Sequence, residues 1–378
     1  MKILFVCENY FPHYGGAEVL FKNLAEGYVK QGNTVSVITQ RLKKTTKTET
    51  INGVHLQRAY SFFSRYLFSF LALPRVIAEA KNYDVIQTTT FNGAFPAWIA
   101  AKIWRKPVVI TIHEVWIGKW QEITGFSIWK SRIHELLERM IYLLPFDRYI
   151  CVSDTTRKDL LQRNIPEEKV KLVYNGFDYS SWNKQNFSKT DVEKIRTQFG
   201  EDKFIYFAWG RPGASKGFEY FIQAAPSILE KIPNALFVLM LGSVDKYKRK
   251  YQELQTLLKT LNLEGKFKII NSVPYSELGN YILAADSIIV PSISEGFGYT
   301  TVEATTLGKS VLISDAGSLL EVVSGKHNVF RRKDIPDLAE KAVLCAQGKY
   351  KEATPKQFTW EKTIEGYLQQ YNSLLRGE

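Results

Sequence analysis

The chain has 378 residues, of which 45% are hydrophobic and 23% are charged, and its formal net charge is +12. This composition excludes a disordered chain, a disulfide scaffold and a protein built on long apolar spans, and the length favours two domains. Residues 1–180 hold 24 Lys and Arg against 16 Asp and Glu, whereas the remainder holds 26 against 22. The basic first half suits an anionic membrane surface or an anionic substrate; no nucleic-acid-binding motif is present, so we expect no nucleic acid partner.

The first half alternates between strand and helix patterns. Leu20, Leu24 and Tyr28 recur at helical spacing behind Gly15-Gly16, and residues 94–102 give a second helix pattern. Short apolar runs predict parallel strands at residues 3–7, 35–39, 84–89, 107–114, 147–153 and 169–176.

The second half repeats this alternation after a polar stretch at residues 180–203. Apolar runs predict strands at residues 204–210, 236–242, 266–270 and 286–290. Helical patterns occupy residues 218–229, 247–261 and 361–375. Strands that alternate with helices in both halves predict an α/β fold with two doubly wound domains.

The most informative segment follows the strand at residues 286–290. Pro291-Ser292 ends the strand, the turn S-E-G-F-G carries Glu295, and a helix that begins near Thr300 carries Glu303. A strand, a glycine turn and a helix together direct backbone N–H groups at an anion. The two carboxylates cannot bind phosphate, so we interpret them as acceptors for sugar or ribose hydroxyls. Glu303 alone would also suit the first turns of a helix as a partner of its dipole.

This segment, with its P-S, E-G-F-G, second Glu and following G-x-x-V run, resembles the retaining glycosyltransferases of family 4. The resemblance implies a GT-B fold, in which two Rossmann-like doubly wound domains face each other across a deep cleft. It implies an acceptor-binding domain at residues 1–180 and a nucleotide-sugar donor domain at residues 181–360. The C-terminal helix, residues 361–378, is expected to pack back on the first domain.

Three further segments match the family. Arg211 and Lys216 lie in G-R-x(4)-K-G just after a strand, and in relatives these cations contact the donor phosphates. Gly15 and Gly16 open the first helix, and in relatives this loop contacts the β-phosphate or the sugar. His113 ends the strand that begins at Pro107, and in relatives this His meets the donor sugar while its carbonyl faces the reacting centre.

The resemblance therefore assigns catalytic and donor-binding roles residue by residue. Glu114 stands where relatives usually have Asp, so no role is assigned to it. The predicted catalytic residues are Glu295, His113, Arg211 and Lys216. The predicted donor-binding residues are Gly15, Gly16, Arg211, Lys216, Val273, Glu295, Gly296, Phe297, Gly298, Tyr299 and Glu303.

The predicted activity is transfer of a hexose, with retention of configuration, from a nucleoside-diphosphate sugar to a hydroxyl. The chain has no Asp-x-Asp motif, so we expect no metal, and we expect no other cofactor. A UDP-sugar is the favoured donor and GDP-mannose the second; the acceptor is expected to be lipid-linked or a glycan in cell-envelope glycan or glycolipid synthesis. A GT-B nucleotide-sugar epimerase and a non-catalytic nucleotide-binding scaffold are the alternatives.

Two aromatic-rich segments, residues 60–76 and 116–146, bear on where in the cell the protein is expected. The second carries Trp116, Trp120 and Trp129 among Lys119, Lys130, Arg132 and Arg139. Tryptophan beside basic residues suits a bilayer interface, although both segments also fit helices whose aromatic side chains pack in a core. No signal peptide is evident and the three cysteines form no disulfide pattern. We therefore expect a cytoplasmic protein, peripheral on the cytosolic face of the membrane.

Overall fold

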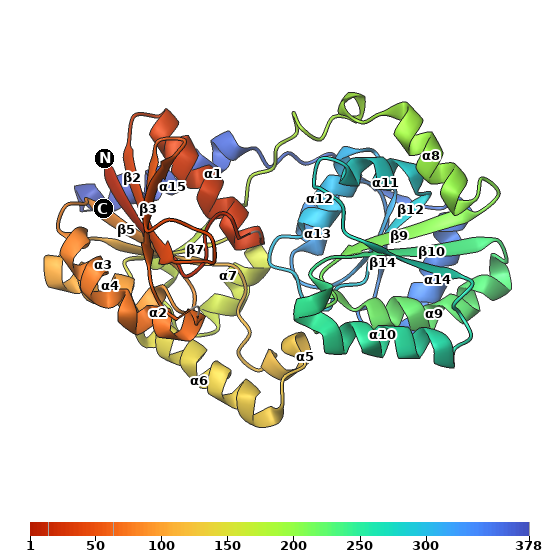
Figure 1. Cartoon of the computed structure of the whole chain (residues 1–378), viewed down its shortest axis with the longest axis horizontal. Coiled ribbons are helices and arrows are strands. Elements are labelled where there is room, and N and C mark those ends of the chain that lie inside the picture. The colour runs from red at the N-terminus through yellow and green to blue at the C-terminus, as the bar shows by residue number, and fades with distance from the viewer. Residues whose placement is uncertain (14, 63, 378) are drawn as a thin grey trace. The chain divides into compact units, whose positions relative to one another are not determined.

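The computed structural model describes residues 1–13, 15–62 and 64–377, which form two compact units (Figure 1). Unit 1 comprises Met1–Gly118, Ile128–Phe177 and Phe358–Glu378, and unit 2 comprises Lys119–Ser127 and Asp178–Gln357. Phe63, which belongs to the first aromatic segment, and Glu378 at the end of the final segment lie outside the described residues.

Unit 1 is built on an eight-stranded sheet with the order β3-β4-β2-β1-β5-β6-β7-β8. Neighbouring strands are parallel, except for the antiparallel pair β3 and β4. The strands are β1 (Lys2–Val6), β2 (Thr34–Gln40), β3 (Thr48–Ile51), β4 (Val54–Ala59), β5 (Val85–Thr89), β6 (Val108–Ile112), β7 (Arg148–Cys151) and β8 (Val170–Leu172).

The β3/β4 hairpin is absent from the predicted elements, although its turn carries a strong signal. Asn52 and Gly53 have φ values of +50° and +80°, which is the backbone that an Asn-Gly hairpin turn adopts. Arg58 of β4 is buried and its guanidinium pairs with the Glu49 carboxylate of β3. The hairpin therefore extends the parallel sheet beyond the six strands that apolar runs predict.

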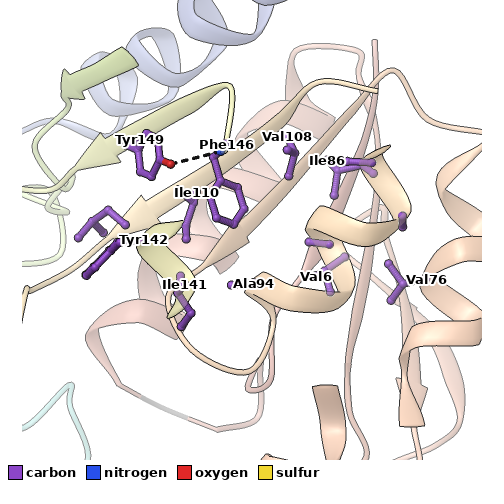
Figure 2. Close-up of a cluster of buried hydrophobic side chains, with 14 of the residues drawn as sticks. Val6, Val76, Ile86, Ala94, Val108, Ile110, Ile141, Tyr142, Phe146 and Tyr149 are labelled. Carbon is purple, nitrogen blue, oxygen red and sulfur yellow. Dashed lines mark hydrogen bonds between the residues drawn. The ribbon is translucent and has the colours of Figure 1, made fainter. Parts of the chain in front are cut away.

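Five helices cover one face of this sheet. They pack apolar side chains into a single core with β1, β5 and β6, and Figure 2 shows Val6, Ile86 and Ile110 of these strands and Ile141 of a covering helix as members of this cluster. Beside them, the Phe146 N–H donates to the Tyr149 hydroxyl at 3.2 Å. The five are α2 (Arg65–Leu71), α3 (Leu73–Ala80), α4 (Ala94–Trp104), α6 (Ile128–Leu143) and α7 (Asp154–Leu161).

Helices α1 (Gly16–Lys30) and α15 (Trp360–Arg376) pack against each other in unit 1. Buried hydroxyls connect them with the sheet. The Tyr28 hydroxyl donates to that of Tyr371 at 3.4 Å, which in turn donates to Gln87 Oε1 of β5 at 2.9 Å. The hydroxyls of Tyr367 and Thr111 of β6 lie 3.0 Å apart. The last helix of the chain is thus tied by polar contacts to the core of the first unit.

Unit 2 has a seven-stranded sheet with the order β11-β10-β9-β12-β13-β14-β15, parallel except for the last pair. Its strands are β9 (Phe204–Gly210), β10 (Ala235–Leu241), β11 (Phe267–Asn271), β12 (Ser287–Val290), β13 (Val311–Ser314), β14 (Gly325–Phe330) and β15 (Lys351–Ala353). Its helices are α5 (Trp120–Thr124), α8 (Lys189–Phe199), α9 (Phe218–Lys231), α10 (Lys248–Thr260), α11 (Leu278–Ala284), α12 (Tyr299–Thr306), α13 (Leu319–Val322) and α14 (Ile335–Ala346).

A stack of aromatic rings crosses three strands in the core of unit 2. The rings of Tyr206 and Phe237 lie 5.5 Å apart at 12°, and those of Phe237 and Phe267 lie 4.7 Å apart at 15°. The stretch Lys119–Ser127 is grouped with this unit because α5 contacts the 3₁₀ turn Ala214–Lys216.

Both sheets reverse their strand order at one point, between β1 and β5 in unit 1 and between β9 and β12 in unit 2. Doubly wound sheets bind ligands at such switch points, outside the carboxyl ends of the strands. The predicted fold class of two Rossmann-like α/β domains is confirmed. None of the helices within residues 1–13, 15–62 and 64–377 is long and apolar enough to cross a bilayer.

Candidate functional site

Loops that follow β9, β12 and β13 meet at the switch point of unit 2. The Ile293 N–H donates to the carbonyl of Ser215 at 2.8 Å, which joins the β12 loop to the β9 loop. The Ser318 N–H and hydroxyl both lie 3.2 Å from the carbonyl of Glu295, which joins the β13 loop to the β12 loop. Backbone contacts therefore fix the position of the segment that carries Glu295.

Two glycines permit these backbone contacts. Gly217 and Gly317 have φ values of +63° and +54°, a region that favours glycine. A Cβ on Gly217 would lie 2.1 Å from the Pro291 carbonyl oxygen, and one on Gly317 would lie 2.2 Å from the Glu295 carbonyl oxygen. Any larger residue at either position would push the loops apart.

Lys216 and Glu295, both predicted site residues, are in direct contact. The Lys216 ammonium pairs with Oε1 of Glu295, and the Ser292 hydroxyl donates to the same oxygen at 2.8 Å. The side chains of Lys216 and Glu295 are only 21% and 13% exposed. Within the described residues no protein group donates to Oε2 of Glu295, so that oxygen is available to a ligand hydroxyl.

Glu303 lies in the first turns of α12, and its carboxylate is buried. Trp209 Nε1 donates to Oε2 at 3.2 Å, and the Tyr275 hydroxyl donates to Oε1 at 2.7 Å. Burial raises the pKa of Glu303 to about 7, and the neighbouring Glu295 adds to this rise, whereas Tyr275, Trp209 and Lys216 oppose it. This carboxylate is therefore easier to protonate than an ordinary one.

The remaining predicted residues of unit 2 surround this pair of carboxylates in the chain. Arg211 is exposed, and its guanidinium makes no ion pair with the residues described. Gly298 has a φ of +88° and precedes α12, and the rings of Phe297 and Tyr299 lie 5.0 Å apart. Val273 is half-buried and follows β11, and Gly296 is half-buried beside Glu295.

A small pocket opens beside Lys216. Its walls come from the ends of β9 and β12 and from the start of α12. The hydroxyl oxygen of Thr300 in this wall is buried and has no hydrogen-bond partner within the described part of the chain. The lining residues are Trp209, Lys216, Phe218, Ile289, Val290, Pro291, Ser292 and Thr300.

In unit 1, Gly15 and Gly16 open helix α1 at the end of the loop after β1. The Glu18 carboxylate lies over this helix start and contacts His13 Nδ1 at 3.0 Å. A Cβ on Gly15 would come within 2.4 Å of the Glu18 carboxylate, so a glycine there leaves room for it. Burial would raise the pKa of Glu18, but the His13 contact and nearby groups lower it overall. The positive end of α1 therefore already faces a carboxylate.

His113 follows β6 and is half-buried. Burial lowers its pKa to about 4, against an opposing effect of Glu18, so the imidazole is neutral at pH 7. Its Nε2 is inaccessible to solvent and has no hydrogen-bond partner within the described residues. Its carbonyl accepts a hydrogen bond from Thr156 Oγ1 at 3.1 Å. This ring nitrogen is thus a buried polar atom without a partner among the described residues.

The loop behind His113 is held by carboxylates of α6. Glu138 is fully buried, and its Oε1 accepts the Trp116 N–H at 2.9 Å and the Tyr142 hydroxyl at 3.1 Å. Glu135 Oε2 accepts the Gly118 N–H at 3.1 Å. Helix α6 therefore fixes the segment that carries His113, which is a positioning role that the sequence does not reveal.

Sequence reasoning missed several direct partners of the predicted carboxylates. Trp209 and Tyr275 contact Glu303, Ser292 contacts Glu295, and Glu18 lies beside the Gly15-Gly16 turn. Ser292 and Glu18 lie in segments in which the sequence predicted other residues, Glu295 and Gly15-Gly16, as site residues. Trp209 and Tyr275 lie 94 and 28 residues from Glu303 in the chain, so only the fold brings them together.

Comparison with known proteins identifies relatives of this chain. The family described as Glycosyltransferase Family 4 matches residues 14–181, and Glycosyl transferases group 1 matches residues 190–352. An uncharacterized glycosyltransferase of Methanocaldococcus jannaschii is 30% identical, over 87% of this chain and 84% of that protein. D-inositol 3-phosphate glycosyltransferase of Corynebacterium jeikeium is 24% identical, over 95% and 92%. Anabaena HepE, solved in complex with UDP and glucose, has a TM-score of 0.77 at 22% identity, over 99% and 100%.

Two Rossmann-like units with these structural neighbours define a glycosyltransferase of the GT-B class. The chain belongs to glycosyltransferase family 4, group 1. The family resemblance predicted from the residues around Glu295 and Glu303 is therefore confirmed.

The loop contacts lead to a first prediction. Gly317→Ala should lower the free energy of unfolding by more than the ~1–2 kcal/mol of left-handed strain, because the methyl group also strikes the Glu295 carbonyl. Gly348→Ala is the matched control, since Gly348 has a φ of +70° and open space around its Cα. Urea unfolding of both variants measures the difference, and equal losses would mean that the loops tolerate the methyl group.

The buried carboxylate gives a second prediction. Since the folded pKa of Glu303 lies near 7 and its ordinary value is 4.5, its contribution to stability is fully present below pH 4.5 and is lost as pH rises through 7. Over that range the loss amounts to about 3 kcal/mol at most. Urea unfolding of Glu303→Gln should therefore show a weaker decline in stability with rising pH than the parent chain. Parallel pH profiles would show that Glu303 ionises normally.

Proposed function

We propose that this glycosyltransferase moves a hexose from a nucleoside-diphosphate sugar to an acceptor hydroxyl with retention of anomeric configuration. The donor is a UDP-sugar, with GDP-mannose as the second candidate, and the acceptor is a lipid-linked or glycan hydroxyl in cell-envelope glycan or glycolipid synthesis. The observation that carries the proposal is the cluster in unit 2, where Lys216 contacts Glu295 at the switch point and the buried Glu303 follows in α12.

Lys216 supplies positive charge for the diphosphate. Its ammonium has three N–H donors, so it keeps its contact with Glu295 and still donates to a phosphate oxygen. Arg211 precedes it in the same loop and is free to add a second cation, since its exposed guanidinium makes no ion pair within the described residues. A fixed cation next to the departing phosphate stabilises the negative charge that develops there.

The two glutamates hold hydroxyls. Oε2 of Glu295 is left available to a sugar hydroxyl, while Oε1 is occupied by Lys216 and Ser292. Glu303 already accepts one hydrogen bond on each oxygen, but an ionised carboxylate has about four acceptor positions, so ribose hydroxyls can add to it. On this basis Glu295 acts at the sugar and Glu303 at the nucleoside.

The candidate residues of unit 1 suit contact with the sugar of the donor rather than with its phosphates. The Glu18 carboxylate at the start of α1 would repel a phosphate near Gly15 and Gly16, whereas it would accept a sugar hydroxyl. The neutral His113 ring offers an unsatisfied Nε2, which suits a hydroxyl partner in either tautomer. Of the two roles that the resemblance allows for the Gly15-Gly16 loop, we therefore propose contact with the sugar.

The reaction needs no protein nucleophile on this proposal. The acceptor oxygen bonds to the anomeric carbon on the face that the nucleotide leaves, and the bond from that carbon to the phosphate oxygen breaks. The acceptor proton passes to the departing phosphate. Lys216, Arg211 and the start of α12 supply the positive charge that a metal would otherwise provide, and the chain has no Asp-x-Asp motif.

Incubation with nucleotide sugars tests the function and separates its alternatives, a GT-B epimerase and a non-catalytic scaffold. Slow release of free sugar and nucleotide in the absence of acceptor is the expected result. A thermal-shift panel should show stabilisation by the matching nucleotide of about 2.7 kcal/mol at a hundredfold excess over its Kd. An isomerised sugar on intact nucleotide would indicate the epimerase. Binding with neither reaction would indicate the scaffold.

The role of Lys216 gives a mutational prediction. Lys216→Ala should raise the activation free energy of transfer by ~2–4 kcal/mol, as expected for one lost preorganised charge contact. Lys250→Ala is the control, because Lys250 forms a similarly shielded ion pair with Glu219 at 2.9 Å in the same unit. Measurement of kcat/KM for both, with and without EDTA, checks the prediction. Equal effects of the two variants, or strict dependence on Mg²⁺ or Mn²⁺, would contradict it.

A further inference from the structure

Helix α6 of unit 1 presents apolar side chains outward and buries polar ones. Its buried residues are Ser131, His134, Glu138, Ile141 and Tyr142, so the inward face is polar over most of the helix and joins the apolar core only near its end. Large apolar side chains recur every three or four residues on the outward face, and those of Trp129 and Leu143 are 75% and 80% exposed. The full outward row is Ile128, Trp129, Ile133, Leu136, Leu137, Met140 and Leu143.

This row continues onto helix α2. Tyr66 joins the two helices, because its hydroxyl lies 3.0 Å from His134 Nε2 of α6, and α2 and α6 lie side by side in unit 1 (Figure 1). Phe70 of α2 is 66% exposed and its ring lies 6.4 Å from that of Phe95 at the start of α4. We call this combined area the α2/α6 surface. It consists of the α6 row with Tyr66, Leu67, Phe70, Leu71 and Phe95.

Exposed charges on these helices are positive. Helix α6 carries Lys130, Arg132 and Arg139 on its exposed side, and the Arg132 guanidinium lies 5.7 Å from the centre of the Trp129 ring. Helix α2 contains no acidic residue and begins with Arg65, which is 47% exposed and lies 3.8 Å from Glu8. The acidic residues of α6 point elsewhere: Glu138 is buried, and Glu135 pairs with Arg139 at 2.7 Å.

An apolar row bordered by basic side chains is complementary to an anionic bilayer. Tryptophan, tyrosine and leucine insert at the level of the lipid headgroups, and lysine and arginine extend to the phosphates. A second copy of the chain suits this surface less well, because a symmetric dimer would bring two surfaces of the same positive charge together. A basic protein partner is disfavoured as well, because its positive charges would face those of the α2/α6 surface.

We infer that the α2/α6 surface docks the protein on an anionic lipid bilayer, with α6 lying in the headgroup layer. The inward face of this helix holds the His113 loop through Glu138 and Glu135, so the docked element is also the support of a predicted site residue. That membrane docking serves a lipid-linked acceptor rests on the proposed function. The docking itself depends only on the surface.

Sedimentation with vesicles tests the inference in the absence of donor and acceptor. The full chain should bind vesicles of phosphatidylcholine with about 30% phosphatidylglycerol, should ignore pure phosphatidylcholine, and should be released between about 50 mM and about 500 mM NaCl. The triple variant Trp129→Ser, Leu136→Ser and Leu143→Ser should lose at least about tenfold in binding. Lys130→Gln with Arg132→Gln should lose about fivefold for each charge removed.

The double variant Ile103→Ser and Leu375→Ser is the matched control, since these residues are 53% and 45% exposed and lie outside the α2/α6 surface. It should bind vesicles like the parent chain. Thermal unfolding with and without nucleotide shows whether each variant keeps its fold and its donor site, so a failure of docking is distinguishable from a failure of the proposed function. Binding that ignores phosphatidylglycerol, or that the α6 variant retains, would overturn the inference. The inference would also be overturned if the parent chain formed a dimer that the α6 variants, but not the control variant, dissociate, because the surface would then be an interface between two copies.

Discussion

The candidate site of unit 2 rests on backbone contact between loops that are remote in sequence. The loop after β9 touches the loop after β12 at Gly217 and Pro291, and the loop after β13 touches Glu295 at Gly317. Since both glycines have positive φ and no space for a Cβ, the contacts depend on residue size as well as on backbone conformation. The positions of Lys216 and Glu295 follow from this approach, because each residue lies next to one of the contacts.

The ion pair between Lys216 and Glu295 also balances charge in the candidate site. Lys216 and Glu295 neutralise each other while the site is free of ligand, which avoids an unpaired charge in a shielded place. The carboxylate of Glu303 is buried without an ion-pair partner among the described residues, and burial raises its pKa even though Trp209 and Tyr275 donate hydrogen bonds that oppose the rise. Two glutamates eight positions apart in the chain thus have different surroundings, since one is paired with a lysine and the other is buried beside a tryptophan and a tyrosine.

The sequence predicted those features that repeat or that belong to a motif. Parallel strands of buried residues read as continuous apolar runs, and the glycine turn between β12 and α12 identified the family. The β3/β4 hairpin escaped because its strands alternate with polar residues and lie outside the apolar runs. For residues 116–146 the sequence left both a bilayer interface and a packed core open, because periodicity shows that a helix has two faces without showing which face turns inward. Partners such as Trp209 and Tyr275 require the tertiary fold, since nothing local in sequence marks them.

The return of α15 to unit 1 has a consequence for biosynthesis. Unit 1 is discontinuous in the chain, and its closing segment, residues 358–377, is translated after all of unit 2. Until then Tyr28 and Gln87 lack the buried hydroxyl of Tyr371, and Gly27 lacks the side chain of Ile364 that packs against it. Unit 1 therefore cannot complete its packing before the last helix of the chain has been made, whereas the whole of unit 2 precedes that helix in the sequence.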